Sequence, residues 1–182
     1  MPRIFTCIFD KIPTVKKLFL FFLITISVIH VSAQQGKSIA PAVRFPTIPP
    51  FTLLKADNTT LTREDLPKYK KTLFMYFSPT CDHCLLQTDS LLANMSKFKD
   101  IQILMATYEP LEAMKNFYDE KHIATYKNIQ IGRDTKFFFP PFFKMNNLPF
   151  LAVYDDKGKL VTVFEGITKI PFLLEAFSRK KR

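Results

Sequence analysis

Residues 73–84, LFMYFSPTCDHC, carry the strongest indication of the fold in this sequence. Residues 73–77 form a continuous apolar run, which is typical of a strand buried on both faces of a sheet. A Ser-Pro dipeptide ends the run, and Cys81 and Cys84 follow almost at once. From there to Phe98, apolar residues recur at helical spacing with polar residues between them. We therefore predict a buried strand, a short loop and an amphipathic helix that begins at the cysteine pair.

Strands and helices alternate along the rest of the chain. Residues 101–108 predict a second strand, and residues 110–118 predict a helix that leads to a brief strand at residues 128–131. This order implies parallel neighbours in one sheet. Residues 150–164 predict two antiparallel strands around an Asp-Lys-Gly-Lys turn, and residues 169–180 predict a closing helix. The predicted fold class is α/β.

Two segments are less regular. Residues 51–54 predict a short first strand, and residues 61–69, interrupted by Pro67, predict an irregular connection. Residues 137–143 read FFFPPFF. We expect most of these phenylalanines to pack in the core, and we expect the prolines to oppose a regular buried element. Part of the segment is then an exposed aromatic surface near the cysteines that receives apolar partner surface.

The N-terminus has the pattern of a secretory signal. Residues 1–17 carry four basic residues and one acidic residue, and a largely apolar run follows at residues 18–29. This run is too short to span a membrane, which takes about 20 apolar residues, but it suits the central region of a signal peptide. Val-Ser-Ala at residues 31–33 offers small residues for cleavage. We predict residues 1–33 as a signal peptide, with an uncleaved N-terminal membrane anchor as the alternative.

Removal of this leader leaves residues 34–50, rich in proline, as a linker and residues 51–182 as a single domain. The whole chain holds 26 basic and 16 acidic residues, of which the leader holds four and one. Basic residues of the remaining chain exceed acidic ones by seven, and four of these charges are residues 179–182. The rest of the domain is nearly balanced, so we expect no nucleic-acid partner. Membrane contact is expected only through the leader or the basic tail, which anionic lipids attract.

The cysteines indicate chemistry on sulfur. Of the three in the chain, Cys7 lies in the predicted leader, which leaves Cys81 and Cys84. An exported protein with one such pair uses it for redox chemistry more readily than as a structural disulfide, which stays an alternative. A second alternative is a redox-linked copper-binding or metallochaperone module, because two thiolates and His83 suit a soft metal. Zinc prefers four ligands, and His122 is the only other histidine after the leader.

The spacing of the pair suits disulfide exchange, which needs a thiolate nucleophile and a second thiol nearby. At the start of a helix, unpaired amide N–H groups stabilise the anion of Cys81, the predicted nucleophile. Cys84, one turn further on, is predicted to be less exposed and to resolve the intermediate. Protonated His83 adds a positive charge that favours the thiolate, whereas Asp82 opposes it.

The apolar strand, the Cys-x-x-Cys helix start and the later segment FKMNNLPF, residues 143–150, together resemble the thioredoxin superfamily. More narrowly, they resemble its exported members of the redoxin and thiol-disulfide interchange type. The resemblance covers about residues 50–180 and implies a three-layer α/β fold with a mixed central sheet flanked by helices. It implies an exported thiol-disulfide oxidoreductase of the periplasm or cell envelope, without an organic cofactor. Its partners would be protein or small-molecule thiols and disulfides, with a membrane thiol carrier as electron donor.

In that family the proline before the penultimate strand is cis and helps to align the partner's backbone, and Pro149 matches its position. Other positions depart from the family pattern. Thr80 stands where the family often has Trp, Met75 where thioredoxins carry a buried acid, and Gln87 where some exported reductases carry Glu. His83 matches the histidine of periplasmic disulfide-introducing oxidases. The direction of electron flow therefore stays open.

Overall fold

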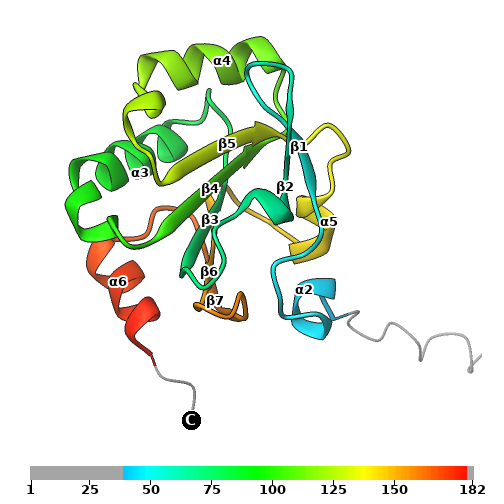
Figure 1. The fold of residues 1–182 in the computed structure, drawn as a ribbon, viewed down its shortest axis with the longest axis vertical. Coiled ribbons are helices and arrows are strands. Elements are labelled where there is room, and N and C mark those ends of the chain that lie inside the picture. Colours follow the sequence, from blue (N-terminus) through cyan, green and yellow to red (C-terminus); the bar gives the residue numbers. More distant parts are fainter. Residues whose placement is uncertain (1–38, 180–182) are drawn as a thin grey trace, which may run out of the picture. The chain divides into compact units, whose positions relative to one another are not determined.

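The computed structural model describes residues 39–179, which contain a seven-stranded sheet (Figure 1). The predicted signal peptide and the last three basic residues lie outside this range. The strands are β1 (Thr52–Leu54), β2 (Thr60–Thr62), β3 (Thr72–Tyr76), β4 (Gln102–Thr107), β5 (Ile129–Arg133), β6 (Phe150–Tyr154) and β7 (Leu160–Glu165). Their order across the sheet is β2-β1-β5-β4-β3-β6-β7. β4 pairs in parallel with β3 and β5, and the remaining pairings are antiparallel, so the sheet is mixed as predicted.

Helices cover both faces of this sheet and complete the predicted three layers. The described helices are α2 (Pro41–Arg44), α3 (Asp82–Ala93), α4 (Leu111–Glu120), α5 (Phe139–Phe143) and α6 (Ile170–Ser178). Buried residues of α3, α4 and α6 belong to the core on one face, and those of α2 and α5 belong to the core on the other (Figure 1). No helix within residues 39–179 is both long enough and apolar enough to cross a membrane.

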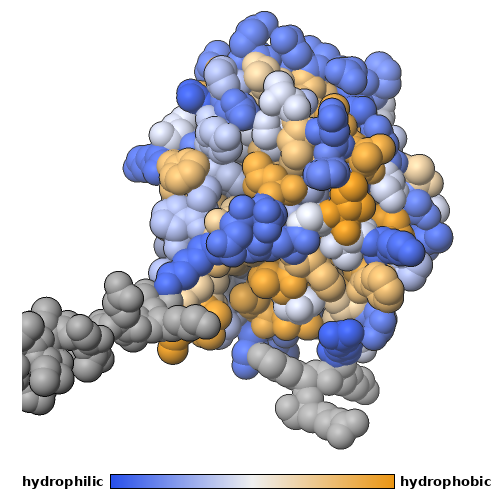
Figure 2. Space-filling model, turned by 180° about the vertical axis from the view of Figure 1, so that it is seen from behind, coloured by the Kyte–Doolittle hydropathy of each residue, from blue (hydrophilic) through white to orange (hydrophobic). Residues whose placement is uncertain are grey.

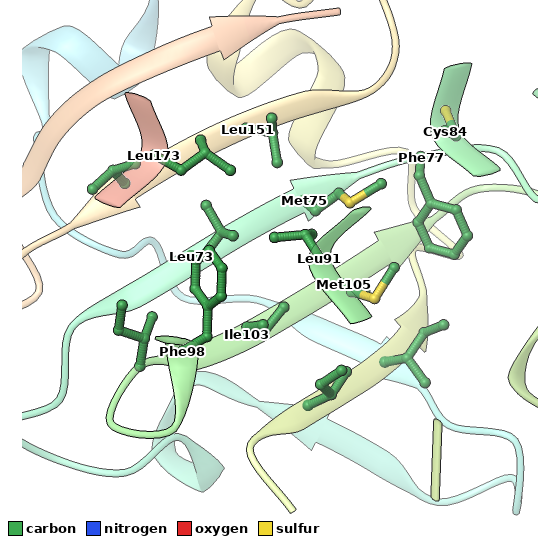
Figure 3. Packing of buried hydrophobic residues seen from close by; sticks show 14 of the residues in the cluster. Leu73, Met75, Phe77, Cys84, Leu91, Phe98, Ile103, Met105, Leu151 and Leu173 are labelled. Atoms are coloured by element: carbon green, nitrogen blue, oxygen red, sulfur yellow. The ribbon is translucent and has the colours of Figure 1, made fainter. Parts of the chain in front are cut away.

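Strand β3 contributes to both cores because successive side chains of a strand point to opposite faces. Leu73 and Met75 lie in the core below α3, α4 and α6, where Met75 is close to Leu91 of α3 (Figure 3). Phe74 and Tyr76 lie in the core below α2 and α5. All five residues of β3 are buried. The strand therefore has the continuous apolar sequence that the chain shows before its cysteines.

The connection predicted for residues 61–69 is wrong at its start. Residues 60–62 form β2, which pairs antiparallel with β1 across a turn where the Asp57 carboxylate accepts the Thr59 N–H at 2.9 Å. Only Leu61 of this three-residue strand is buried, so the sequence has too little alternation to indicate it. Part of the predicted linker, residues 41–44, forms α2, which contacts α5.

The FFFPPFF segment contains a regular buried element after all. Its last five residues form α5, with both prolines in the first turn, where a helix has no use for their missing N–H groups. Phe139 and Phe143 are buried against Phe74, at ring-centroid distances of 4.5 and 5.5 Å. Phe137, just before the helix, is 52% exposed. The expected exposed aromatic surface is therefore limited to the start of the segment.

The side turned away in Figure 1 carries apolar side chains in patches that polar and charged side chains separate (Figure 2). Exposed apolar residues in the described range include Val163 of β7 and Phe172 of α6. Scattered apolar side chains of this kind are ordinary on a protein surface.

Candidate active site

Cys81 occupies the N-cap position of α3, directly after the loop that leaves β3. Its backbone is extended, with φ −94° and ψ 115°, and its carbonyl accepts the N–H groups of Cys84 at 2.9 Å and Leu85 at 3.0 Å. The residue is partly exposed. The peptide N–H groups of the first turn of this twelve-residue helix point towards its N-terminus. They favour negative charge at the position of the Cys81 sulfur.

Cys84 is fully buried one turn further along α3, beside Phe77 at the end of β3 (Figure 3). Burial raises the pKa of its thiol to about 12, because desolvation disfavours the thiolate. The backbone of Ser78 lowers this pKa in part, and hydrogen bonding and charge from Cys81 raise it further. Both cysteines are free thiols. The two sulfurs are thus close together but in opposite environments.

Asp82 and His83 lie in the first turn of α3 and are both exposed. Neither side chain forms a hydrogen bond or an ion pair with any residue between 39 and 179. The helix start therefore brings all four residues of the Cys-Asp-His-Cys motif into one turn. The tuning effect of Asp82 and His83 on the sulfurs stays a prediction.

Pro149 lies at the same end of the sheet as the cysteine pair. The Leu148–Pro149 peptide bond is cis, as the resemblance implies, and Pro149 is buried. The next residue, Phe150, pairs with Tyr76 at the end of β3, from which the cysteine loop departs. Leu148 packs against the cores on both faces of the sheet. The structure thus places the Pro149 loop at the end of the sheet where the chain leaves β3 towards Cys81.

The loop before Pro149 is held by Glu165 at the end of β7, a residue that the sequence did not indicate. One carboxylate oxygen accepts the backbone and side-chain N–H groups of Asn146 at 3.3 and 3.4 Å. The other accepts those of Asn147, both at 3.2 Å. A single side chain therefore fixes the backbone of two successive residues just before the cis peptide bond.

A second carboxylate holds the loop before Cys81. The Ser78 hydroxyl donates to Glu109 at 2.9 Å and accepts the Thr80 N–H at 3.3 Å. Glu109 itself is fixed because its carbonyl accepts a hydrogen bond from Arg133 at 2.8 Å. The negative charge of the Glu109 carboxylate raises the pKa of Tyr108, the preceding residue.

An aromatic hollow of about 120 Å³ lies next to Leu148. Tyr108 and Phe137 form an edge-to-face pair in its wall, with ring centroids 5.6 Å apart, and are 42% and 52% exposed. The rest of the lining comes from Tyr76, Pro140, Met145, Asn146, Asn147 and Leu148. This hollow is the part of the FFFPPFF region that matches the expected exposed aromatic surface, and its contact with a partner stays a prediction.

Asp134 is a buried acid that attaches α5 to the sheet. It is 2% exposed, and its carboxylate accepts the backbone N–H groups of Phe138 and Phe139, both at 3.0 Å. It also accepts the Tyr76 hydroxyl at 3.3 Å. Burial, and then the charge of Asp134, raise the pKa of Tyr76. Asp134 lies four residues before Phe138, the N-cap of α5, so its role does not follow from the usual N-cap pattern in the sequence.

Two positions where the resemblance to the thioredoxin superfamily implies acids hold neutral side chains here. Met75 is fully buried in the core below α3. Gln87 is also fully buried, and its Oε1 accepts the Thr168 N–H at 2.7 Å, which ties α3 to the segment before α6. Neither residue can accept a proton from a thiol in the way a carboxylate does.

Within residues 39–179, no three His, Cys, Asp or Glu side chains are grouped so that they could hold a metal ion. The described residues therefore offer a metal at this site no third ligand beside the two thiols.

Comparison with solved structures shows a thioredoxin-like fold. The chain is similar to the pneumococcal exposed lipoprotein thioredoxin Etrx1 from Streptococcus pneumoniae, with 21% identity, a TM-score of 0.59 and coverage of 71% of this chain and 98% of that one. It is similar to a putative thioredoxin from Neisseria meningitidis, with 20% identity, a TM-score of 0.57 and coverage of 71% and 86%. A putative thiol:disulfide interchange protein DsbE from Chlorobium tepidum gives 16% identity, a TM-score of 0.57 and coverage of 72% and 90%.

No family model matches the sequence, and no curated protein matches it. The fold that the sequence predicts is thus confirmed by structural similarity at low identity. A secreted disulfide oxidoreductase from Mycobacterium tuberculosis is also similar, with 15% identity, a TM-score of 0.57 and coverage of 70% of this chain and 94% of that one.

Proposed function

We propose that this chain is a thiol-disulfide oxidoreductase that uses Cys81 as nucleophile and Cys84 as resolving thiol. The supporting observation is the contrast between a partly exposed sulfur at a helix N-terminus and a buried thiol one turn away. Cys81 attacks a partner disulfide, forms a mixed disulfide and releases the first partner thiol. Cys84 then attacks the Cys81 sulfur, which releases the second partner thiol and leaves the pair oxidised.

The finer parts of the proposal follow from the sequence. Protein or small-molecule thiols and disulfides are the partners, and a membrane thiol carrier restores the reduced pair. Pro149 aligns the partner backbone, and Asp82 and His83 tune the potential. The predicted leader directs the protein to the periplasm or cell envelope. That location is supported by the similarity to Etrx1, which is described as an exposed lipoprotein.

Trapping tests the assignment of the two thiols. With Cys7 replaced by Ser in every sample, the Cys84→Ala variant should accumulate a mixed disulfide with insulin, seen as a mass increase that dithiothreitol reverses. Cys81→Ala should not, because its remaining thiol is buried. Equal trapping by both variants would contradict the proposed roles. The reduction potential of the pair then decides between reductase and oxidase.

The copper-binding alternative makes a different prediction. Anaerobic titration of the reduced protein with Cu(I) would then show tight stoichiometric binding, together with no turnover of insulin.

A further inference from the structure

Gln87 has a buried hydrogen-bond donor without an acceptor. The side chain is 0% exposed, and its Oε1 is committed to the Thr168 N–H at 2.7 Å. This bond fixes the orientation of the carboxamide, so that Nε2 points away from Thr168. Nε2 has no hydrogen-bond partner among residues 39–179. An unpaired buried donor costs free energy and calls for an explanation, which a role in chemistry can supply.

The reacting sulfur nearest to Gln87 along α3 is that of Cys84. The two residues are three positions apart on one helix, a spacing that places side chains on the same face. Both are fully buried. The groups that influence Cys84 are the Ser78 backbone and Cys81, and no acid is among them. The Cys84 sulfur becomes negative in this apolar core, where few hydrogen-bond donors are available.

We propose that the Gln87 amide donates a hydrogen bond to the negative charge that develops on Cys84 in the resolving step. The inference rests on the proposed function. In that step the Cys84 sulfur bonds to the Cys81 sulfur, and the bond between Cys81 and the partner sulfur breaks. The partner sulfur leaves with the bonding electron pair and takes up the proton that Cys84 gives up. The dithiol is oxidised by two electrons and the partner disulfide is reduced, while Gln87 neither gains nor loses a proton.

A two-phase reaction with 5,5′-dithiobis(2-nitrobenzoate) separates the two thiols. The full chain is used, with Cys7→Ser in every sample. Attack by Cys81 releases the first thionitrobenzoate, and resolution by Cys84 releases the second. Gln87→Met removes the donor, and also the acceptor of the Thr168 N–H, with little change of shape. It should leave the first phase unchanged and slow the second about tenfold, equivalent to 1.4 kcal/mol.

Gln87→Glu provides a second variant that keeps an oxygen for the Thr168 N–H. Its carboxylate cannot donate, so the second phase should be slow at neutral pH. Its rate relative to the unsubstituted protein at the same pH should recover as acid protonates the carboxylate. The matched control is Gln130→Met on β5, since Gln130 holds the other unpartnered buried amide atom in the described range. This control should leave both phases unchanged.

The outcomes separate the donor role from a structural one. A second phase at the unsubstituted rate in Gln87→Met would overturn the proposal. If Gln87→Met does not fold, the same result in Gln87→Glu would overturn it. Equal slowing of both phases would indicate a structural role and also overturn it. Failure of the protein with Gln87 intact to release thionitrobenzoate at all would instead count against the proposed function.

Discussion

The two faces of the sheet use polarity in opposite ways. The face below α3, α4 and α6 holds the buried thiol Cys84 among aliphatic, methionine and phenylalanine side chains. The face below α2 and α5 is rich in aromatic rings and has the buried carboxylate of Asp134 at its edge, where it binds Tyr76 and the start of α5. The buried acid Asp134 thus stabilises the fold, whereas the pKa of the Cys84 thiol is raised mainly by burial. The two faces meet at the Pro149 loop.

Removal of Asp134 should have the largest effect on stability. Asp134→Ala leaves the Tyr76 hydroxyl and two backbone N–H groups unpaired in the core, so we expect the free energy of unfolding to fall by roughly 3 kcal/mol. Chemical denaturation measures this loss. Asp134→Asn keeps one acceptor oxygen and should lose less. Thiol reactivity at Cys81 should be unchanged under native conditions, and a large change would show that the two faces are coupled.

The buried thiol predicts a pH dependence of stability. The pKa of Cys84 is raised in the folded protein to about 12, above its ordinary value of about 8.5, so its stabilising contribution is complete below pH 8. As pH rises between these two values, the unfolded chain releases the proton first and stability falls, by about 2 kcal/mol at pH 10. Urea denaturation of the reduced protein at pH 7 to 10 measures this slope. Cys84→Ala should lack this part of it, and identical slopes would contradict the raised pKa.

Substitution of Glu165 tests the role of the loop before Pro149, where the two faces of the sheet meet. Glu165→Ala releases the backbone of Asn146 and Asn147, so we expect reaction with a protein disulfide to slow about fivefold, the equivalent of roughly 1 kcal/mol for exposed hydrogen bonds. Reaction with a small disulfide reagent should not change, because a small reagent needs no backbone alignment. Glu165→Gln, which keeps one acceptor, should slow the protein reaction less. An equal loss with both substrates would argue that the loop acts on Cys81 itself.

Local sequence patterns were sufficient for most elements. The apolar run of β3, the helix start at Cys81 and the hairpin of β6 and β7 each depend on neighbours in the chain. Sequence periodicity did not predict the elements that are short or rich in proline. β2 buries a single side chain, and α5 is a five-residue helix that depends on a distant Tyr76 and a buried acid.

Periodicity and spacing within short stretches were sufficient to predict the α/β class, the elements β3 to β5 with α3 and α4 between them, and the position of the cysteine pair at a helix start. The long-range contacts of Glu165, Glu109, Asp134 and Gln87 follow from the three-dimensional fold alone. In each of these contacts the partner lies on a segment at least 18 residues away in the sequence, which the fold brings close. A single carboxylate or amide in a sequence gives no sign of its hydrogen-bond partners, because those partners lie on segments that only the fold brings close.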